Sequence, residues 1–377
     1  MEQGRPSEHR IDRAAQWVLA RRVENGLPDD RTFRKEPRTL PPLGLGQILV
    51  RTTHISMDPH TAGEIGPKPE GVTAKAQQEV LPPTEVGAPI PGFALGEVLE
   101  SRDPTIAAGE AVQGYWGWQT HAVARLTPTG TEGVASSTEQ ILGDENVVSR
   151  VSNDVRPVSA ALHVLGEMGL AGYVGLTAVG RPRAGDVVFV SSAAGTVGGV
   201  VGQTAKNLGC RAVGSVGSEG KASYIVDTLG FDDAVNYNAD DVERQLDAAC
   251  PDGIDVYFDN VGGHVSDLVI QRLRPRARVV VCGVTAEWTA SGPSVGPRLY
   301  WPLLVRRARI EGFSLWDHLD KYEESYRQVA EWLRKGCLIS PETIVDGFDL
   351  VPATFGDFLR GRYYGKVIVR VAPDAPR

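Results

Sequence analysis

The spacing of hydrophobic positions changes near residue 150 of the chain. Before this point, short runs rich in Val, Ile and Thr, such as residues 46–55, are separated by turns that contain Pro and Gly, which is typical of short strands. After it, unbroken apolar runs of strand length alternate with segments of helix length, as in a parallel sheet that helices cover on both faces. The pattern predicts an α/β protein with a partly open β-barrel and a doubly wound parallel sheet.

The second region begins with a buried strand over residues 186–192 and a helix over 197–208. Further strands are predicted at 211–216, 234–237, 254–259 and 278–284, with a helix over 221–229. A long helix over 319–334 then leads back to strand-like segments, the last at 366–371. We therefore assign residues 1–150 to the first part of the barrel domain, 151–320 to the parallel-sheet domain, and 321–377 to a return to the barrel domain.

Composition and charge exclude several classes of protein. The 377 residues are 42% hydrophobic and 23% charged, with a net charge of −8, so the chain is globular and unsuited to nucleic acid as its main partner. No apolar run reaches the roughly 18 residues that span a bilayer. The amino terminus lacks the apolar core of a signal peptide. We expect a cytoplasmic protein with neither a membrane nor a nucleic-acid partner.

A glycine-rich turn joins the first predicted strand of the second region to its helix. It includes Gly195, Thr196, Val197 and Gly198. Glycine permits a sharp turn there and brings backbone N–H groups toward a pyrophosphate at the amino end of the helix. Because the turn lies between a strand and a helix, it predicts dinucleotide binding.

The end of the next strand is expected to select the cofactor. Ser218 lies near its tip and Lys221 follows three residues later. A hydroxyl and a cation suit a 2′-phosphate, which a carboxylate would repel. NADPH is therefore favoured, although Glu219 is a candidate for holding the free ribose of NADH instead.

Several motifs together resemble the zinc-independent branch of the medium-chain dehydrogenase/reductase superfamily. Within it, the chain is similar to the group of prostaglandin reductase, leukotriene B4 12-hydroxydehydrogenase and plant alkenal double-bond reductase. The resemblance runs from about Gln16 to Val371. Its most specific parts are residues 117–119, 193–198, 201–203, 230–232, 236–237, 252–263, 296–298 and 307–313.

The resemblance implies a GroES-like β-barrel catalytic domain, a Rossmann domain, an active site between them, and a homodimer. It implies NADPH as the cofactor and a small molecule with conjugated double bonds as the substrate. The positions that it assigns to the cofactor, beyond the glycine-rich turn and Ser218, are Lys221, Tyr237, Asn260, Cys282, Gly283, Phe313 and Tyr363.

No metal site is predicted. Zinc alcohol dehydrogenases of the superfamily place a cysteine before an Asp and a His in a Gly-His-Glu segment. The matching stretches here, residues 55–60 and 91–94, contain no cysteine, and Phe93 stands where the histidine would be. His60 and His121 would bind a metal only together with a third ligand.

The positions expected near the substrate depart from the family pattern. Trp288 replaces the tyrosine that follows the Cys-Gly turn, His60 replaces a tyrosine, and Glu167 begins a segment that reads Met-Pro-Gly-Leu-Thr in the family. We expect Trp288, His60 and Glu287 as catalytic candidates, since an indole N–H donates a hydrogen bond and the other two groups carry protons. The predicted substrate pocket consists of His60, Trp118, Trp288 and Tyr300.

These features predict an NADPH-dependent reductase that adds hydride to a conjugated C=C bond by 1,4- or extended 1,6-addition. The predicted substrate is a bulky enone or polyene from specialised metabolism. One alternative is a reductive cyclase, of the kind that forms polycyclic tetramate macrolactams. Another, of a different class, is a non-catalytic NADPH-binding sensor or structural relative. In simpler interpretations, Trp288 is a lid on the cofactor, His60 is a loop residue and Glu287 faces solvent.

Overall fold

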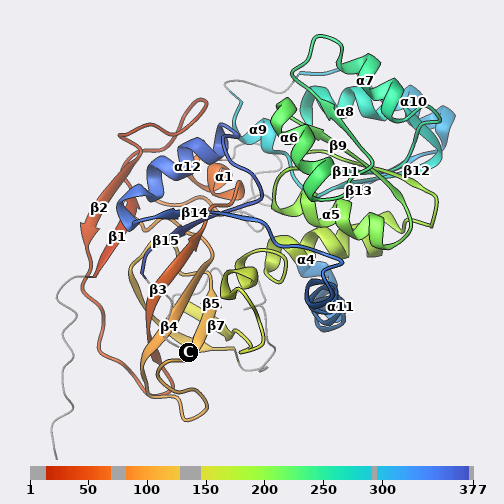
Figure 1. Ribbon diagram of the computed structural model, residues 1–377. Coiled ribbons are helices and arrows are strands. Elements are labelled where there is room, and N and C mark those ends of the chain that lie inside the picture. The colour runs from red at the N-terminus through yellow and green to blue at the C-terminus, as the bar shows by residue number, and fades with distance from the viewer. Residues whose placement is uncertain (1–13, 69–81, 128–145, 291–294, 373–377) are drawn as a thin grey trace, which may run out of the picture.

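The chain folds into two domains that lie side by side (Figure 1). The computed structural model describes residues 14–68, 82–127, 146–290 and 295–372. One domain is built on a seven-stranded sheet and the other on a six-stranded sheet. Among the described residues, no helix is both long enough and apolar enough to cross a bilayer.

The first domain is a small β-barrel. Strand β3 pairs with β4 on one side and with β6 on the other, which closes the ring in the order β3-β4-β5-β7-β6. The barrel is therefore closed, and not partly open as the short strands suggested. Its elements are β1 (Ala15–Leu19), β2 (Phe33–Pro37), β3 (Ile48–Ser56), α1 (His60–Ile65), β4 (Ala94–Ser101), β5 (Ala111–Gly114), β6 (His121–Leu126) and β7 (Asn146–Arg150).

The second domain is a Rossmann domain with an all-parallel sheet in the order β10-β9-β8-β11-β12-β13. Its strands are β8 (Val187–Val190), β9 (Arg211–Val216), β10 (Asp233–Asn236), β11 (Ile254–Asp259), β12 (Leu273–Val281) and β13 (Arg309–Gly312). Its helical segments are η1 (Val158–Leu162), α4 (Glu167–Val174), η2 (Gly175–Gly180), α5 (Thr196–Asn207), α6 (Glu219–Ser223), η3 (Tyr224–Thr228), α7 (Val242–Ala249), α8 (Gly263–Ile270), α9 (Thr285–Trp288) and α10 (Tyr300–Arg306).

Alternation along the buried strands explains why helices cover both faces of this sheet. In β8, Val188 and Val190 belong to a core shared with α5 and η2, whereas Val187 and Phe189 belong to a core shared with α7 and α8. Successive side chains of a strand point to opposite faces, so an unbroken apolar strand needs a helical layer on each side.

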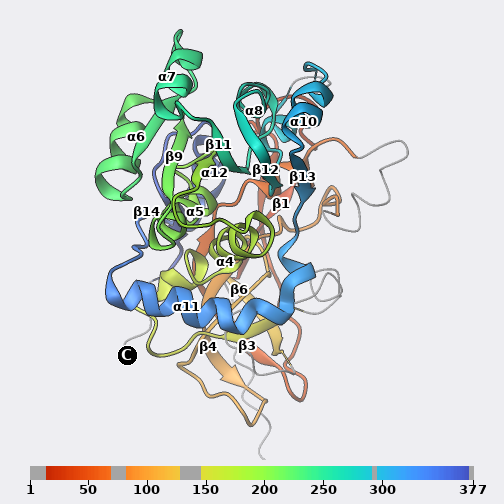
Figure 2. The same cartoon turned by 90° about the vertical axis from the view of Figure 1, so that its right-hand side faces the viewer.

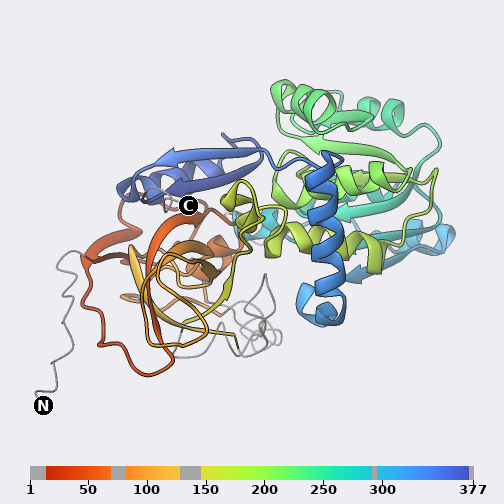
Figure 3. The same cartoon turned by 60° about the horizontal axis from the view of Figure 1, so that its bottom comes forward.

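The last two strands of the chain join the barrel sheet. After η4 (Leu315–Lys321) and α11 (Tyr322–Lys335) come β14 (Glu342–Asp346), η5 (Phe348–Leu350), α12 (Val351–Leu359) and β15 (Lys366–Arg370). Strand β15 pairs with β3 and β14 pairs with β15. Figure 3 shows this last, blue part of the chain running from α11, beside the Rossmann domain, to strands on the barrel.

Helix α4 lies where the two domains meet. Its residues Leu170, Ala171 and Val174 share a hydrophobic core with Leu95 of β4 and Ile368 of β15. It also packs on α5 and α11, and α11 crosses close to it in Figure 2. A residue at the amino end of α4 is therefore held between the barrel and the Rossmann sheet.

Candidate active site

The glycine-rich turn forms a tight cradle at the amino end of α5. Gly195 caps the helix, and a Cβ atom on Gly198 would lie 2.3 Å from the carbonyl oxygen of Ser192. Ser192 itself has a φ of +53°. Only glycine at position 198 lets the first turn of the helix come this close to the loop, which leaves its N–H groups available for phosphate.

A cation stands at the carboxyl end of β9. Lys221 donates a 2.6 Å hydrogen bond from Nζ to the carbonyl oxygen of Gly361, and Ser218 caps α6 by accepting from the Lys221 N–H. Burial lowers the pKa of Lys221. Lys221 forms no ion pair within the described ranges, so its charge is free to meet a phosphate.

The turn after β9 holds its carboxylate against a neighbouring side chain, which favours a phosphorylated ribose over a free one. Glu219, the residue that could hold the hydroxyls of NADH, accepts a 2.7 Å hydrogen bond from Nδ2 of Asn236. The ring of Tyr237 covers the chain at Gly217, where an added Cβ would lie 2.7 Å from its hydroxyl oxygen. Glu219, the one carboxylate in residues 217–221, is therefore hydrogen-bonded to Asn236, whereas the Lys221 ammonium group has no carboxylate partner in the described part of the chain.

The turn after β11 is fastened to the turn after β12. Asn260 donates from Nδ2 to the carbonyl oxygen of Ser191 over 2.8 Å, and its own carbonyl oxygen accepts a 2.9 Å hydrogen bond from Thr285. The N–H groups of Cys282 and Gly283 both donate to the carbonyl oxygen of Asp259. These carboxyl ends of parallel strands form the edge at which open α/β sheets bind ligands.

Helix α9 brings Trp288 to the barrel. The helix contacts α1, which begins at His60, and the Trp288 side chain packs against the barrel core. Two of the catalytic candidates therefore lie on contacting helices from the two domains. Glu287, the third, is exposed.

An aromatic and acidic cluster surrounds His60. The ring of Tyr115 lies 6.0 Å from that of His60 and 4.7 Å from that of Phe93, measured between centroids. The Tyr115 hydroxyl donates a 2.6 Å hydrogen bond to Oε1 of Glu64 and lies 3.3 Å from Nε2 of His60. Burial, followed by the neighbouring Glu64 carboxylate, raises the pKa of Tyr115 well above its ordinary value.

A buried ion pair that includes Asp58, two residues before His60 in the sequence, holds this segment in place. Lys366, which is fully buried at the start of β15, donates a 2.6 Å hydrogen bond to Oδ1 of Asp58. Ser56 donates to the other carboxylate oxygen. Burial alone would raise the pKa of Asp58, but the charges of Lys366 and His60 and the hydrogen bonds from Lys366 and Ser56 together outweigh burial, and the pKa is lowered. The segment that carries His60 is thereby fastened to the last strand of the chain.

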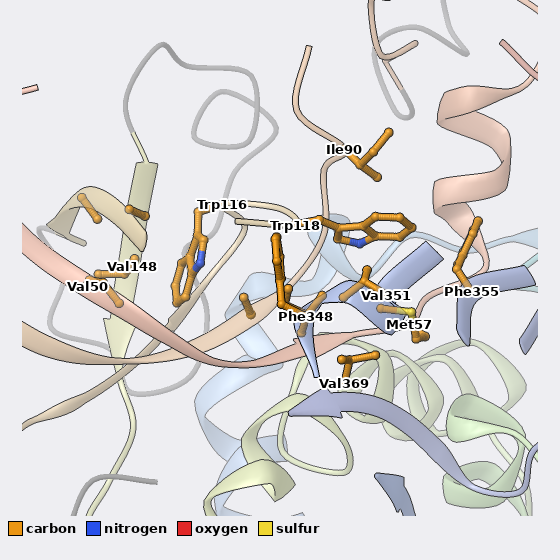
Figure 4. Close-up of a cluster of buried hydrophobic side chains, with 14 of the residues drawn as sticks. Val50, Met57, Ile90, Trp116, Trp118, Val148, Phe348, Val351, Phe355 and Val369 are labelled. Atoms are coloured by element: carbon orange, nitrogen blue, oxygen red, sulfur yellow. The ribbon is translucent and has the colours of Figure 1, made fainter. Parts of the chain in front are cut away.

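Two of the predicted pocket residues lie elsewhere. Trp118 is 1% exposed and packs in the barrel core against Phe355 (Figure 4). Its ring also lies against that of Phe33. Tyr300 is 80% exposed on α10, which packs on β12. An aromatic residue in a sequence does not reveal whether it faces a core, a cleft or solvent.

Of the two adjacent tyrosines near the end of the chain, Tyr364 approaches the cofactor loop. The centre of its ring lies 5.9 Å from Nζ of Lys221. The same ring packs edge-on against the ring of Tyr224. Tyr363, which the resemblance assigned to the cofactor, packs on the barrel core. Alternation along an extended segment places neighbouring side chains on opposite faces. At the other end of the site, Phe313 stacks on His318 and lies against Gly175.

Sequence reasoning missed Tyr115, Glu64 and any role for Glu167. A signal for Glu64 existed, because it follows His60 by four residues, a spacing that puts two side chains on one face of a helix. The departure at Glu167 was visible as an acid where the family pattern has Met. Tyr115 comes from a distant segment, and nothing in the sequence joins it to His60.

The geometry defines a two-domain protein with a dinucleotide-binding cradle on the Rossmann domain and a polar, aromatic cluster on the barrel. Comparison with known proteins agrees. A family model described as the N-terminal domain of oxidoreductase matches residues 15–131, and one described as zinc-binding dehydrogenase matches residues 196–335. NADPH-dependent curcumin reductase of Escherichia coli is 35% identical over 96% of this chain and 98% of its own length.

Two further relatives extend the comparison. Prostaglandin reductase 1 of Mus musculus is 32% identical over 95% of this chain and 99% of its own. The solved structure of CurA in complex with NADPH from Vibrio vulnificus matches with a TM-score of 0.82 and 31% identity, over 95% of this chain and 99% of that one. The chain belongs to the zinc-independent group of the medium-chain dehydrogenase/reductase superfamily.

Membership of this group, whose relatives include NADPH-dependent reductases, confirms the prediction of an NADP-dependent enzyme that acts on C=C bonds with NADPH as its cofactor. The cradle at Gly198 and the uncompensated charge of Lys221 fit a phosphorylated dinucleotide. Among the described residues, no group of three or more His, Cys, Asp or Glu side chains could hold a metal ion.

Proposed function

We propose that this protein reduces a conjugated C=C bond in a bulky, flat, polyunsaturated carbonyl compound, by 1,4-addition or by 1,6-addition along an extended dienone. The observation that carries the proposal is the aromatic set of His60, Phe93 and Tyr115 on the barrel, with Trp288 on the helix that contacts α1. Aromatic side chains suit planar conjugated ligands, because flat surfaces bury large areas against each other.

The bound NADPH supplies hydride to carbon. The residues proposed to hold it are Gly195, Thr196, Val197, Gly198, Ser218, Lys221, Tyr237, Asn260, Cys282, Gly283 and Phe313, with Tyr364 in place of Tyr363. The protein must orient the acceptor and donate hydrogen bonds to the oxygen that becomes negative. We propose the indole N–H of Trp288 and the ring N–H of His60 for this task, since both are donors on facing helices.

The experiment is NADPH oxidation with a graded panel: a short alkenal, a monocyclic enone, a diaryl dienone and a linear polyene ketone. The proposal predicts that kcat/KM rises with the conjugated area of the acceptor. In Trp288→Ala, this advantage should shrink by about 10-fold or more, which corresponds to one lost aromatic contact of roughly 1.5 kcal/mol. A matched control is Trp316→Ala, whose side chain packs in the cluster around α4 and α11. Equal kcat/KM values across the panel would contradict the proposal.

Ring closure is the second candidate product for a polyene. Hydride addition followed by attack of the resulting carbanion on a second acceptor, and then by protonation, adds two hydrogens in total, as simple reduction does. Mass alone does not separate the two products. The number of olefinic carbons does, because reduction removes one C=C bond and reductive cyclisation removes two. NADPH carrying deuterium at C4 marks the carbon that receives the hydride.

We further propose that the protein works as a cytoplasmic homodimer. An apolar patch on α10 and the strand after it supports this proposal: Tyr300, Trp301, Leu304, Val305 and Ile310 are all exposed. Strand β13 ends the order of the Rossmann sheet in the part of the chain that the structure describes. A second copy placed against β13 would cover the patch and extend the sheet.

A further inference from the structure

Glu167 begins α4 at the junction of the two domains (Figure 1). The helix is held firmly against the dinucleotide-binding helix: a Cβ atom on Gly172 would lie 3.0 Å from the carbonyl oxygen of Val197. The position of Glu167 is therefore fixed relative to the cofactor cradle by backbone packing. It does not depend on a loop.

One carboxyl oxygen of Glu167 has no partner. Oε2 is buried and forms no hydrogen bond within the described part of the chain, although the residue as a whole is only half-buried. A buried polar atom without a partner lowers the stability of the folded protein, so its retention calls for an explanation. A carboxyl group that waits for a ligand provides one.

Charged and titratable groups from both domains lie close enough to Glu167 to interact with its charge. Asp58, Glu64, Tyr115 and Lys366 belong to the barrel, and Cys282 and Tyr322 belong to the elements after β12 and η4. Glu167 therefore interacts electrostatically both with acids of the His60 cluster and with Cys282 of the turn after β12. An acceptor that meets both the cofactor turn and the barrel cluster would stand near this carboxyl group.

The same surroundings keep Glu167 protonated. Burial, followed by repulsion from Asp58 and then Glu64, raises the pKa of Glu167 to about 8, while Lys366 acts in the opposite sense. At neutral pH most molecules then carry a neutral carboxylic acid, which has an O–H donor. A poised acid of this kind is the usual requirement of a proton donor.

The neighbouring acid is less suitable. Oε2 of Glu64 also has no hydrogen-bond partner in the described part of the chain, but Glu64 is 3% exposed and its Oε1 already accepts the hydrogen bond from Tyr115. Tyr115 in turn gives its single proton to that bond. Of the three groups, only Glu167 combines partial exposure with an unused carboxyl oxygen.

We propose that Glu167 is the general acid of the reaction. This proposal rests on the proposed reduction of a conjugated carbonyl compound. When hydride adds to the β carbon, the π electrons of the C=C bond move into an enolate. The O–H bond of Glu167 then breaks, its proton forms a C–H bond at the α carbon, and the carboxylate that remains regains a proton from solvent. Hydride and proton together account for the two hydrogens of the product.

The test uses the full-length protein with Glu167→Gln, which keeps the shape of the side chain and removes the acid, and with Glu167→Met, the residue of the family pattern. Glu342→Gln is the matched control, because Glu342 is another half-buried carboxyl with a raised pKa but is hydrogen-bonded to Ser159 and Ser340. Three quantities are measured: the dissociation constant of NADPH, the pH profile of kcat, and the infrared band of a protonated carboxyl group.

We expect kcat of the wild type to fall as the pH rises through about 8, and a carboxylic-acid band to disappear over the same range. Glu167→Gln should lower kcat by about 10²- to 10⁴-fold, lose the alkaline limb and lose the band, with NADPH affinity unchanged. Glu342→Gln should retain all three wild-type features.

A Glu167→Gln protein that keeps the wild-type kcat and alkaline limb, or that keeps the titrating band, would overturn the assignment of Glu167 alone. A wild type that binds NADPH and reduces no member of the panel would overturn the proposed function, and this inference with it. The variant comparison and the wild-type panel thus separate the two failures.

Discussion

The ammonium group of Lys221 lies 5.9 Å from the centre of the Tyr364 ring and donates a hydrogen bond to the carbonyl oxygen of Gly361. Lys221 belongs to the Rossmann domain, whereas Gly361 and Tyr364 belong to the segment that leads into the last barrel strand. The N–H of Gly365 also donates to the carbonyl oxygen of Ala194 in the glycine-rich turn. The barrel domain thus contacts both parts of the predicted cofactor site: the glycine-rich turn, expected to bind the pyrophosphate, and Lys221, expected to bind the 2′-phosphate.

Lys221→Ala should weaken NADPH binding by about 10- to 150-fold, the equivalent of one charge-assisted hydrogen bond of roughly 1.5–3 kcal/mol. NADH binding should change little, because NADH has no 2′-phosphate. Fluorescence titration with both cofactors measures this. Lys206→Ala is the control, since Lys206 is paired with Asp232 on the same domain. Equal losses for NADPH and NADH would show that Lys221 does not select the phosphate.

Gly198→Ala should abolish tight NADPH binding and lower the free energy of unfolding by about 1–3 kcal/mol, because the added methyl group would overlap backbone atoms of the glycine-rich turn. Gly199→Ala serves as the control: its Cβ would lie 3.2 Å from the flexible side chain of Leu229 and 3.7 Å, an ordinary contact distance, from the carbonyl oxygen of Ala193. Thermal unfolding and NADPH titration compare the two. If both variants bind NADPH normally, the cradle does not hold the pyrophosphate.

The buried, neutral side chain of His163 should make the free energy of unfolding fall in acid. Burial lowers its pKa from 6.5 to about 3, and Nδ1 lies 2.8 Å from the hydroxyl of Ser340. The folded protein therefore binds its proton less readily than the unfolded chain does. The stabilisation is complete above pH about 6.5 and is lost as the pH falls toward about 3, at roughly 1.4 kcal/mol per pH unit.

Chemical denaturation at a series of pH values measures this slope. We expect His163→Gln to have a shallower dependence on pH below about 6.5 than the wild type, whatever its stability at neutral pH. The exposed His264 gives the control variant, His264→Gln. An unchanged slope in His163→Gln would assign the acid sensitivity to other groups.

Lys366→Met should lower the free energy of unfolding by about 3–5 kcal/mol, since it leaves the Asp58 carboxylate buried without its partner. The double variant Asp58→Asn with Lys366→Met should recover part of this loss, because it removes the uncompensated charge as well. Equilibrium unfolding in urea tests both. A double variant that is less stable than Lys366→Met would contradict this account of the pair.

Leu304→Asp should convert the proposed homodimer to a monomer, because it puts a charge in the centre of the apolar patch on α10. Sedimentation velocity measures the assembly state. Leu45→Asp, at an exposed leucine before β3 in the barrel domain, is the control and should leave the dimer intact. A wild-type protein that sediments as a monomer would contradict the proposed homodimer.

Local pattern was sufficient for the parallel sheet and its first helix. Residues 197–208 were predicted as a helix and α5 covers Thr196–Asn207; the strand predicted at 254–259 is β11. The helix predicted over 221–229 is interrupted, with α6 followed by the π-helical segment η3. Strand β12 also begins earlier than predicted, at Leu273. The domain boundaries at residues 150 and 320 stay a prediction.

The sequence alone determined the α/β class with its parallel sheet, the cradle at Gly198 and the preference for NADPH, because each depends on residues that are close together in the chain. Only the tertiary structure decided which aromatic side chains face the junction, since Trp118 and Tyr300 carry no local sign of their burial or exposure. It also brought Tyr115 to Glu64, Lys366 to Asp58 and Tyr364 to Lys221. Such pairs arise where separate strands and domains meet, and sequence spacing does not encode a distance between them.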